Sequence, residues 1–255
     1  MHIFIFCFWS SSMEIINLSN SERCRIAEAL LASYEFKNTK IKRIIILPVP
    51  SFRGGAHVSG TDLTADDVIA LVGDGDLVVG YRLPEELCVR IEDRGASILE
   101  LEQDEAYIAK NNELTSHATL GYILSERGRD VTDTRVGIIG YGRLGSSLLR
   151  LLLFLGADVT VFSGSPEKRE ALSREGVDCL DYADITRLST DVLINTAPDK
   201  FFSIAPDTSL FLDIASGNFY QSEGAVFLPS LPEKRYPKSA GKAYAQAVID
   251  YISLH

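Results

Sequence analysis

A strand–turn–helix–strand segment in the second half of the chain constrains the fold more than any other feature. It reads VGIIGYGRLGSSLLRLLLFLGADVTVFS and spans residues 136–163. Its apolar, β-branched ends predict two buried strands, and the leucine-rich stretch from Leu144 to Leu155 predicts a helix between them. Neighbouring parallel strands need such a crossover helix, so the segment predicts a parallel sheet that is covered by helices.

The turn of this segment carries the pattern G-x-G-x-x-G. Its residues are Gly140, Tyr141, Gly142, Arg143, Leu144 and Gly145. In this setting Gly140 allows a tight turn, Gly142 lets a pyrophosphate approach the backbone, and Gly145 lets the helix pack close to the strand. The helix N-terminus then offers backbone amides and a partial positive charge to phosphates. A purely structural βα turn is the alternative, but the flanking strand and helix favour a dinucleotide-binding Rossmann unit.

The end of the second strand lacks an acid that would select NAD. In NAD-preferring units an Asp or Glu at this point accepts hydrogen bonds from the ribose hydroxyls. Here the strand ends at Ser163, 23 residues after Gly140, and Ser165, Lys168 and Arg169 follow. Hydroxyls and cations suit a 2′-phosphate, which a carboxylate would repel. The same stretch also fits an ordinary helix start with a serine cap and an N1 proline. We therefore expect NADP as the cofactor, with NAD as the alternative.

Two later strands end in polar loops that we expect to border the nicotinamide position. Ligands of open parallel sheets bind outside the carboxyl ends of the strands. The loop residues concerned are Asn195, Thr196, Ala197 and Pro198 after one strand, and Asp213 after the next. Ordinary strand-ending turns are the alternative interpretation of both loops.

Strands and helices alternate along the rest of the chain as well. Apolar runs such as EIINL, IIILPVP, DLVVGYR and ASILEL predict strands of a first sheet, with SFRGGAHVSG as a glycine-rich loop. We predict an α/β protein of two lobes with a cleft between them: a smaller N-terminal parallel α/β domain and a C-terminal Rossmann nucleotide-binding domain. The expected ranges are 13–114 for the small domain, 115–240 for the Rossmann domain with a linking helix at 115–127, and 241–255 for a C-terminal helix.

Composition excludes some classes of function. The chain has 255 residues, of which 46% are hydrophobic, and its formal net charge of −10 argues against nucleic acid as a partner. The four cysteines and four histidines are scattered without the spacing of a metal site or a disulfide framework. We therefore expect no metal and a reducing compartment.

The first residues, MHIFIFCFWSSSM, are unusual. The apolar run from Ile3 to Trp9 is too short to span a bilayer, and it has neither a basic leader nor a cleavage site for secretion. We favour Met13 as the true start over a membrane anchor. A cytoplasmic protein that does not bind membranes is the resulting expectation.

Five segments in order resemble the dipicolinate synthase A family, whose nucleotide domain is related to that of the 2-hydroxyacid dehydrogenases. They are NELTSHATLGYIL, the glycine segment with its two strands, LINTAP, LFLDIASG and LPSLPEKRYPKSAG. The resemblance covers the chain from about residue 111 to 249 and is weaker in the first lobe, where IIILPVP is the clearest shared piece.

The resemblance implies an NADP-dependent oxidoreductase of sporulation. Such an enzyme would dehydrogenate a dihydrodipicolinate-type cyclic imine dicarboxylate to dipicolinate, as a base removes a proton and hydride passes to the nicotinamide. The family works with a separate flavoprotein subunit, dipicolinate synthase B, so the resemblance raises such a flavoprotein as a partner. We also expect a homo-oligomer.

Two departures from the family pattern fall on the substrate side. Where the family has a Gly-Gly-Asp-x-Arg turn, this chain has Ser19-Asn20-Ser21-Glu22-Arg23 and keeps the arginine alone. Where the family has Thr-x-Glu-Gly before the linking helix, this chain has Thr-Ser-His-Ala at residues 115–118. The cofactor is therefore better supported than the substrate.

Four residues are candidates for work on the substrate. His117 is the candidate base, because an imidazole exchanges protons near neutral pH. Lys238 lies in the PKSAG segment and, by resemblance, would bind a substrate carboxylate. Arg53 and Arg82 follow predicted strands, and their planar guanidinium groups suit carboxylates. A helix-start histidine, a surface lysine and solvated loop arginines are the structural alternatives.

Two other functions stay open at this stage. One is an NAD(P)-dependent dehydrogenase of another small hydroxy or amino acid on the same scaffold. The other is a catalytically silent NADP-binding subunit, which the altered first lobe and the histidine at position 117 would allow.

Overall fold

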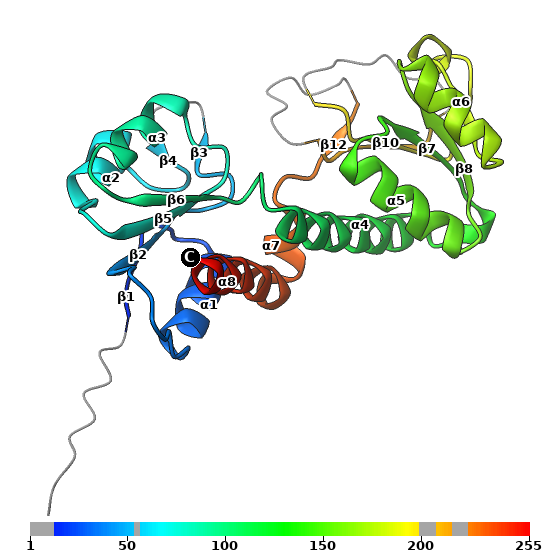
Figure 1. Ribbon diagram of the computed structural model, residues 1–255. Helices are drawn as coiled ribbons and strands as arrows, with labels where there is room; N and C mark the ends of the chain where they lie inside the picture. Colours follow the sequence, from blue (N-terminus) through cyan, green and yellow to red (C-terminus); the bar gives the residue numbers. More distant parts are fainter. Residues whose placement is uncertain (1–12, 54–56, 199–207, 216–223) are drawn as a thin grey trace, which may run out of the picture. The chain divides into compact units, whose positions relative to one another are not determined.

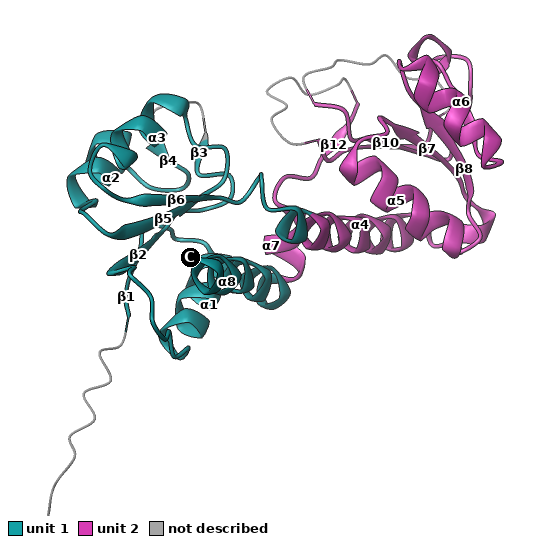
Figure 2. Ribbon diagram, viewed as in Figure 1, with its two compact units in different colours: residues 1–108, 237–255 teal, residues 109–236 magenta. Residues whose placement is uncertain are grey.

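A computed structural model describes residues 13–53, 57–198, 208–215 and 224–255, and the side chain of Arg53 lies outside the described part. The chain divides into two compact units (Figure 2). Unit 1 combines Met1–Ile108 with Pro237–His255, and unit 2 comprises Ala109–Tyr236. The C-terminal segment therefore returns to the unit in which the chain begins.

Unit 1 is built on a parallel sheet of four strands in the order β1-β2-β5-β6 (Figure 1). The strands are β1 (Glu14–Asn17), β2 (Arg43–Ile46), β5 (Asp76–Gly80) and β6 (Ser97–Glu100). β2 and β5 are buried along most of their length, which explains their continuous apolar sequence. All four strands thus end at the same edge of the sheet, which we call the carboxyl edge of unit 1.

Helices cover both faces of this sheet. One face packs against α1 (Glu22–Ala32) and α8 (Pro237–Leu254), through Cys24, Ala27, Tyr244 and Val248 among others. The other face packs against α2 (Ala65–Leu71) and α3 (Glu85–Glu92). Alternate residues of β2 face the two cores, because side chains alternate along a strand.

Local sequence explains where the first helices begin. The Ser21 hydroxyl accepts a hydrogen bond from the Cys24 amide and caps α1. Thr64 is the N-cap of α2 and forms a reciprocal capping box with Asp67. The hydrogen bonds from Thr64 lower the pKa of the Asp67 carboxyl. Each cap satisfies amides that lack a partner within the helix.

The segment predicted as a glycine-rich loop contains a short hairpin. Strands β3 (Phe52–Arg53) and β4 (His57–Val58) pair in antiparallel register. The predicted loop is therefore wrong at these four positions, because two-residue strands leave too short a period for the sequence pattern to reveal.

The C-terminal helix packs on α1, and a glycine makes this possible. A Cβ at Gly241 would lie 2.6 Å from Ile26 Cβ and 2.8 Å from the Arg23 carbonyl oxygen. The small residues at 240 and 241 thus allow close helix contact. This contact places residues 237–255 in unit 1, whereas the sequence-based ranges set 115–240 and 241–255 apart from the small domain.

Unit 2 is built on a parallel sheet of six strands in the order β12-β11-β10-β7-β8-β9. The strands are β7 (Arg135–Ile139), β8 (Asp158–Phe162), β9 (Asp178–Leu180), β10 (Val192–Asn195), β11 (Leu210–Asp213) and β12 (Val226–Phe227). The order reverses between β7 and β10, which is the doubly wound Rossmann arrangement. The predicted α/β fold class is confirmed in both units.

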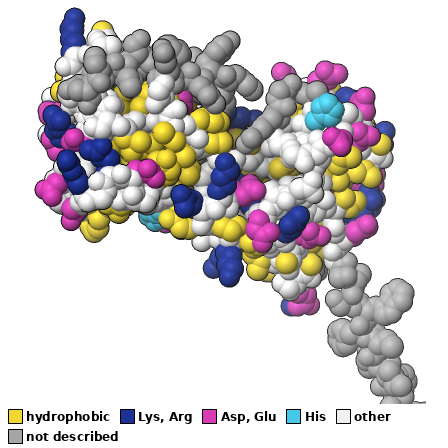
Figure 3. Space-filling view, turned by 180° about the vertical axis from the view of Figure 1, so that it is seen from behind, with side chains coloured by type: hydrophobic (Ala, Val, Ile, Leu, Met, Phe, Trp, Pro, Cys, Tyr) yellow, Lys and Arg dark blue, Asp and Glu magenta, His cyan; other side chains and the backbone are white. Residues whose placement is uncertain are grey.

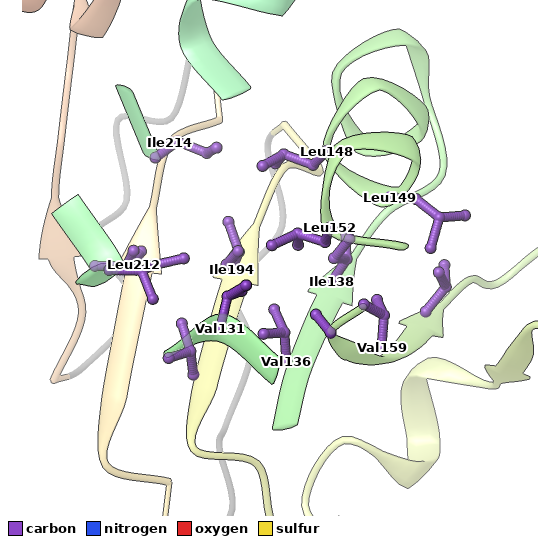
Figure 4. Close-up of a cluster of buried hydrophobic side chains, with 14 of the residues drawn as sticks. Val131, Val136, Ile138, Leu148, Leu149, Leu152, Val159, Ile194, Leu212 and Ile214 are labelled. Atoms are coloured by element: carbon purple, nitrogen blue, oxygen red, sulfur yellow. The ribbon is translucent and has the colours of Figure 1, made fainter. Parts of the chain in front are cut away.

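One core of unit 2 lies between this sheet and the helices α4 (Glu105–Arg127) and α5 (Arg143–Phe154). Figure 4 shows Leu148 and Leu152 of α5 directed towards Ile138 and Ile194 of the central strands. The predicted helix is confirmed as α5, and its leucines Leu148, Leu149 and Leu152 pack into the core.

The linking helix is longer than predicted. α4 begins ten residues before the predicted start at Thr115, and its first four residues belong to unit 1. A 3₁₀ turn spans Tyr182–Asp184. Unit 2 also contains α6 (Pro166–Arg174) and the short α7 (Leu231–Arg235).

Charged side chains are mixed on the molecular surface. Figure 3 shows basic and acidic groups interspersed over the face in view. Within the described residues, no helix is both long and apolar enough to cross a membrane.

Candidate functional site

The glycine turn lies where the strand order of unit 2 reverses, between the ends of β7 and β10. Gly140 has φ +96°, a left-handed conformation that favours glycine. A Cβ at Gly140 would lie 2.9 Å from Thr196 Oγ1, and a Cβ at Gly145 would lie 2.1 Å from the Gly140 carbonyl oxygen. Both glycines are therefore required for the loop to close against its neighbours.

Gly142 plays a different part. It is the N-cap residue of α5, it provides no side-chain cap, and nothing lies within 4 Å of the position that a Cβ would take. The first turn of α5 is thus open at its N-terminal end. An uncapped helix start beside unobstructed backbone is the arrangement that receives a pyrophosphate.

The loop after β10 supports the glycine turn from the side. The Thr196 hydroxyl lies 2.9 Å from the Ile139 carbonyl oxygen and 3.2 Å from that of Gly140. Asn195 is fully buried; its Oδ1 accepts a hydrogen bond from the Ala197 amide, whereas its Nδ2 has no partner. A buried amide donor without a partner is costly, so it marks a position that fits a polar ligand group.

The remaining loop residues are placed as follows. Ala197 is buried and Pro198 is exposed, while Asp213 at the end of β11 is fully buried. The Asp213 Oδ1 accepts a hydrogen bond from the Ala215 amide. Asn195 and Asp213 are paired in register on β10 and β11, so both side chains arise at the carboxyl edge of this sheet.

Residues at the end of β8 form the region where a 2′-phosphate would distinguish NADP from NAD. Ser163 is buried, and its hydroxyl accepts a hydrogen bond from the Ser165 amide. Ser165 caps α6 by accepting from the Lys168 amide, and its hydroxyl donates to Glu167. This hydrogen bond lowers the pKa of the Glu167 carboxyl. Ser165 is therefore the cap of an ordinary helix start, which was the alternative interpretation of this stretch.

The two cations after β8 turn back towards the glycine loop and the sheet. Lys168 Nζ donates to the Tyr141 carbonyl oxygen at 2.9 Å, which joins α6 to the glycine turn. Arg169 Nη1 donates to the Ser163 carbonyl oxygen at 2.7 Å and pairs with Asp181 at 2.7 Å. Lys168 is therefore held at the glycine turn, and Arg169 is held at the ends of β8 and β9.

Asp181 is a contributor that sequence reasoning missed. It follows β9, the strand next to β8, and it accepts the ion pair from Arg169. Its signal in the sequence is weak, because the acid lies 12 residues beyond Arg169 and only the parallel pairing of β8 with β9 makes the two ends neighbours.

His117 and Ser116 occupy different faces of α4. His117 is exposed, whereas Ser116 is buried and its hydroxyl donates to Ser147 of α5 at 3.0 Å. The helix start predicted at Thr115 is wrong, so His117 lies within a long helix and not in its first turn. Its side chain is exposed to solvent.

The other substrate candidates belong to unit 1. Lys238 is exposed in the first turn of α8. Arg82 has φ +55°, its Nε donates to Glu102 at 2.8 Å, and its guanidinium lies 5.6 Å from the centre of the Tyr81 ring. Arg53 lies in β3, and its side chain is outside the described residues.

Comparison with known proteins identifies the domain type of unit 2. Residues 109–201 match the NAD binding domain of the D-isomer specific 2-hydroxyacid dehydrogenases. The open helix start, the glycine turn and the unpartnered amide of Asn195 fit a nicotinamide dinucleotide at this edge of the sheet. Unit 2 is therefore a nicotinamide dinucleotide-binding domain.

Two solved structures share the fold over nearly the whole chain. The first, dipicolinate synthase A of Bacillus halodurans, matches with a TM-score of 0.75 and 16% identity, covering 95% of this chain and 98% of that one. The second, dipicolinate synthase A of Bacillus subtilis, matches with a TM-score of 0.73 and 19% identity, covering 95% and 96%. The chain therefore has the fold of dipicolinate synthase A.

A curated relative from a plant matches part of the chain. The 8-hydroxygeraniol dehydrogenase of Catharanthus roseus is 26% identical over an alignment 167 residues long. The alignment covers 56% of this chain and 42% of that protein. The chain spans less than half of the length of the curated relatives that it matches.

Proposed function

We propose that this protein is an NADP-dependent dehydrogenase of the dipicolinate synthase A type. Its substrate would be a dihydrodipicolinate-type cyclic imine dicarboxylate, which it oxidises to dipicolinate. One observation carries the proposal: at the carboxyl edge of unit 2, the glycine turn leads into a helix start without a side-chain cap. Lys168 contacts this turn, and Arg169 contacts the end of the neighbouring strand β8. The likeness in fold to two dipicolinate synthase chains supports the choice of reaction.

The residues of unit 2 divide the work of holding the dinucleotide. The pyrophosphate would bind at the first turn of α5, near the open backbone of Gly142. The amide of Asn195 would donate to the nicotinamide end, because its Nδ2 is buried without a partner. Asp213, at the neighbouring strand end, would border the same end of the cofactor.

Cations beside the turn support NADP as the dinucleotide. Lys168 contacts the glycine turn through the Tyr141 carbonyl oxygen, and its ammonium would neutralise a 2′-phosphate bound there. Arg169 would add a second donor, although Asp181 competes for it. No carboxylate takes the place of Ser163 at the end of β8, which is where NAD-preferring units have one.

The chemistry requires a base and a cation for the substrate. When bound, the nicotinamide supplies a hydride acceptor at its C4. His117 would take up the proton that leaves the substrate, at an imidazole nitrogen that is open to solvent in the structure. Lys238, Arg53 and Arg82 would hold the two carboxylates, and aromatisation of the ring would favour the forward direction.

The same resemblance extends the proposal to the protein's setting. A flavoprotein of the dipicolinate synthase B type would be its partner, and the chain would act in the cytoplasm during sporulation as a homo-oligomer. The fold likeness to a protein that is named as one subunit of dipicolinate synthase supports a partner of this kind.

A titration of the full chain with NADPH and with NADH, followed by fluorescence, tests the cofactor. We expect NADPH to bind at least about tenfold more tightly, the effect of one charge-assisted contact worth about 1.4 kcal/mol. The variant Lys168→Ala should lose most of this preference and keep its NADH affinity. Equal binding of both dinucleotides would refute the choice of NADP, and failure to bind either would refute the dehydrogenase itself.

A further inference from the structure

Unit 1 contains a buried positive charge that the proposed function does not use. Arg23 belongs to the first turn of α1, and only 2% of its surface is exposed. Its Nη1 donates to the Tyr107 hydroxyl at 2.9 Å, and its Nε is buried without a partner. Among the described residues, no carboxylate pairs with this guanidinium. Burial of an unpaired charge is strongly unfavourable, so the arrangement calls for a ligand.

One tyrosine hydroxyl contacts this guanidinium, and a second tyrosine packs against the first. Tyr107 and Tyr244 meet edge to face with ring centres 6.4 Å apart. The Tyr244 hydroxyl is within hydrogen-bond distance of the Leu47 and Val79 carbonyl oxygens, at 3.0 and 3.2 Å, so it is already satisfied by the sheet. The cluster thus leaves the Arg23 Nε as its unmatched group.

The cluster lies at the carboxyl edge of unit 1. Arg23 follows β1, Tyr107 follows β6, Leu47 follows β2, and Val79 lies near the end of β5. Tyr81, which is half-buried, follows β5 as well, and it packs against the hydrophobic cluster that contains Tyr107 and Tyr244. Open parallel sheets bind ligands at this edge, so the position of the charge agrees with its chemistry.

A half-buried arginine of the same sheet shows the contrast. Arg43, at the start of β2, makes two hydrogen bonds to Asp76, whose side chain is 2% exposed. That pair lies at the amino edge of the same sheet and is complete without a ligand. The arginine at the amino edge is therefore paired with a carboxylate, whereas, within the described part of the chain, Arg23 at the carboxyl edge is not.

We infer that Arg23 is the anchor of a carboxylate-binding site at the carboxyl edge of unit 1, with a small dicarboxylate as its ligand class. The guanidinium Nε would donate to a carboxylate oxygen, and Tyr107 holds the other side of the group in place. The inference deepens the proposed function and rests on it for the choice of ligand. It adds a buried arginine to the loop arginines named above as a residue that binds the substrate carboxylate.

Calorimetric titration of the full chain with pyridine-2,6-dicarboxylate tests the site. The variant Arg23→Met removes the charge and keeps an unbranched side chain, and we expect its dissociation constant to rise at least about 30-fold, the smaller end of the cost of losing one partner of a buried charge pair. Arg23→Lys should restore part of the affinity. Unchanged affinity of Arg23→Met, or absence of binding to the wild-type chain, would overturn the inference.

Stability separates a binding role from a structural one. Because the charge is unpaired, we expect Arg23→Met to unfold in urea at the same or a higher midpoint than the wild type. The matched control Arg43→Met should unfold at a lower urea concentration, because it leaves the Asp76 carboxylate without its partner. Its dicarboxylate affinity should equal that of the wild type. A fall in midpoint for Arg23→Met with retained affinity would show a structural arginine and overturn the inference.

Two further probes distinguish the inference from the proposed function. NADPH binding to Arg23→Met should equal that of the wild type, so a failure of NADPH to bind either chain refutes the dehydrogenase and leaves the carboxylate site standing. Inorganic phosphate should bind more weakly than the dicarboxylate. Equal affinity for phosphate would overturn the carboxylate class of the ligand.

Discussion

Two glycines of the same turn should differ in how much stability the chain loses when one methyl group is added. Gly142→Ala places its Cβ where nothing lies within 4 Å, and its φ of −98° suits alanine. Gly145→Ala places its Cβ 2.1 Å from the Gly140 carbonyl oxygen, and no rotamer change can move a backbone atom away. The first change therefore fills space reserved for a ligand, and the second forces the loop itself to shift.

The magnitudes follow from these contacts. Gly142→Ala should lower the free energy of unfolding by no more than about 1 kcal/mol, since alanine is a poorer helix cap than glycine. Its methyl group should weaken NADPH binding by about 5- to 150-fold, the effect of 1 to 3 kcal/mol of overpacking against the pyrophosphate. Gly145→Ala should lose at least about 1 to 3 kcal/mol of stability as well as NADPH binding.

Urea unfolding and NADPH fluorescence titration of both variants measure the two quantities separately. If Gly142→Ala binds NADPH as tightly as the wild type, the pyrophosphate does not approach the backbone at this position, and the interpretation of the turn is refuted. A Gly145→Ala variant of unchanged stability would contradict the close helix packing.

Three other changes test the framework. Hydrogen bonds, chiefly from the Arg135 amide, lower the pKa of the Asp191 carboxyl in the folded state. This carboxylate therefore contributes stability above about pH 4, which is lost as the pH falls further. Asp191→Asn should remove that contribution, so the free energy of unfolding in urea, measured between about pH 2 and 7, should fall less steeply towards acid than in the wild type. Gly241→Ala should destabilise unit 1 by about 1 to 3 kcal/mol through collision with Ile26, whereas unchanged urea unfolding would show that α8 can move aside. Tyr244→Phe should cost about 1 kcal/mol through its lost hydrogen bonds, as thermal unfolding can measure, and a more stable variant would contradict that role.

The parts of the fold that follow from local patterns could be predicted from the sequence. The glycine turn, the buried strands beside it and the helix that follows it each depend on residues close together in the chain, and the structure confirms them. The hairpin at Phe52 and His57 and the early start of α4 could not be predicted, because short strands and a mixed polar helix carry little periodicity.

The candidate site divides in the same way. The turn that receives a pyrophosphate is encoded in six consecutive residues, whereas the pairing of Arg169 with Asp181 depends on the register of β8 and β9. Arg23 illustrates a further limit. Its sequence neighbours give an ordinary helix start, and only tertiary packing leaves its charge buried and without an acid.

The return of α8 to unit 1 sets an order for folding on the ribosome. Unit 2 is one continuous insertion, residues 109–236, so all of it is synthesised before α8. Unit 1 has to wait with Cys24, Ala27 and Leu31 exposed until α8 emerges, because α8 supplies the layer that covers them. Unit 1 therefore matures after unit 2 although its first strands are made earlier, the reverse of the usual N-terminal-first sequence. Termination of synthesis between unit 2 and α8 would spare the nucleotide domain and leave unit 1 as an aggregation-prone fragment.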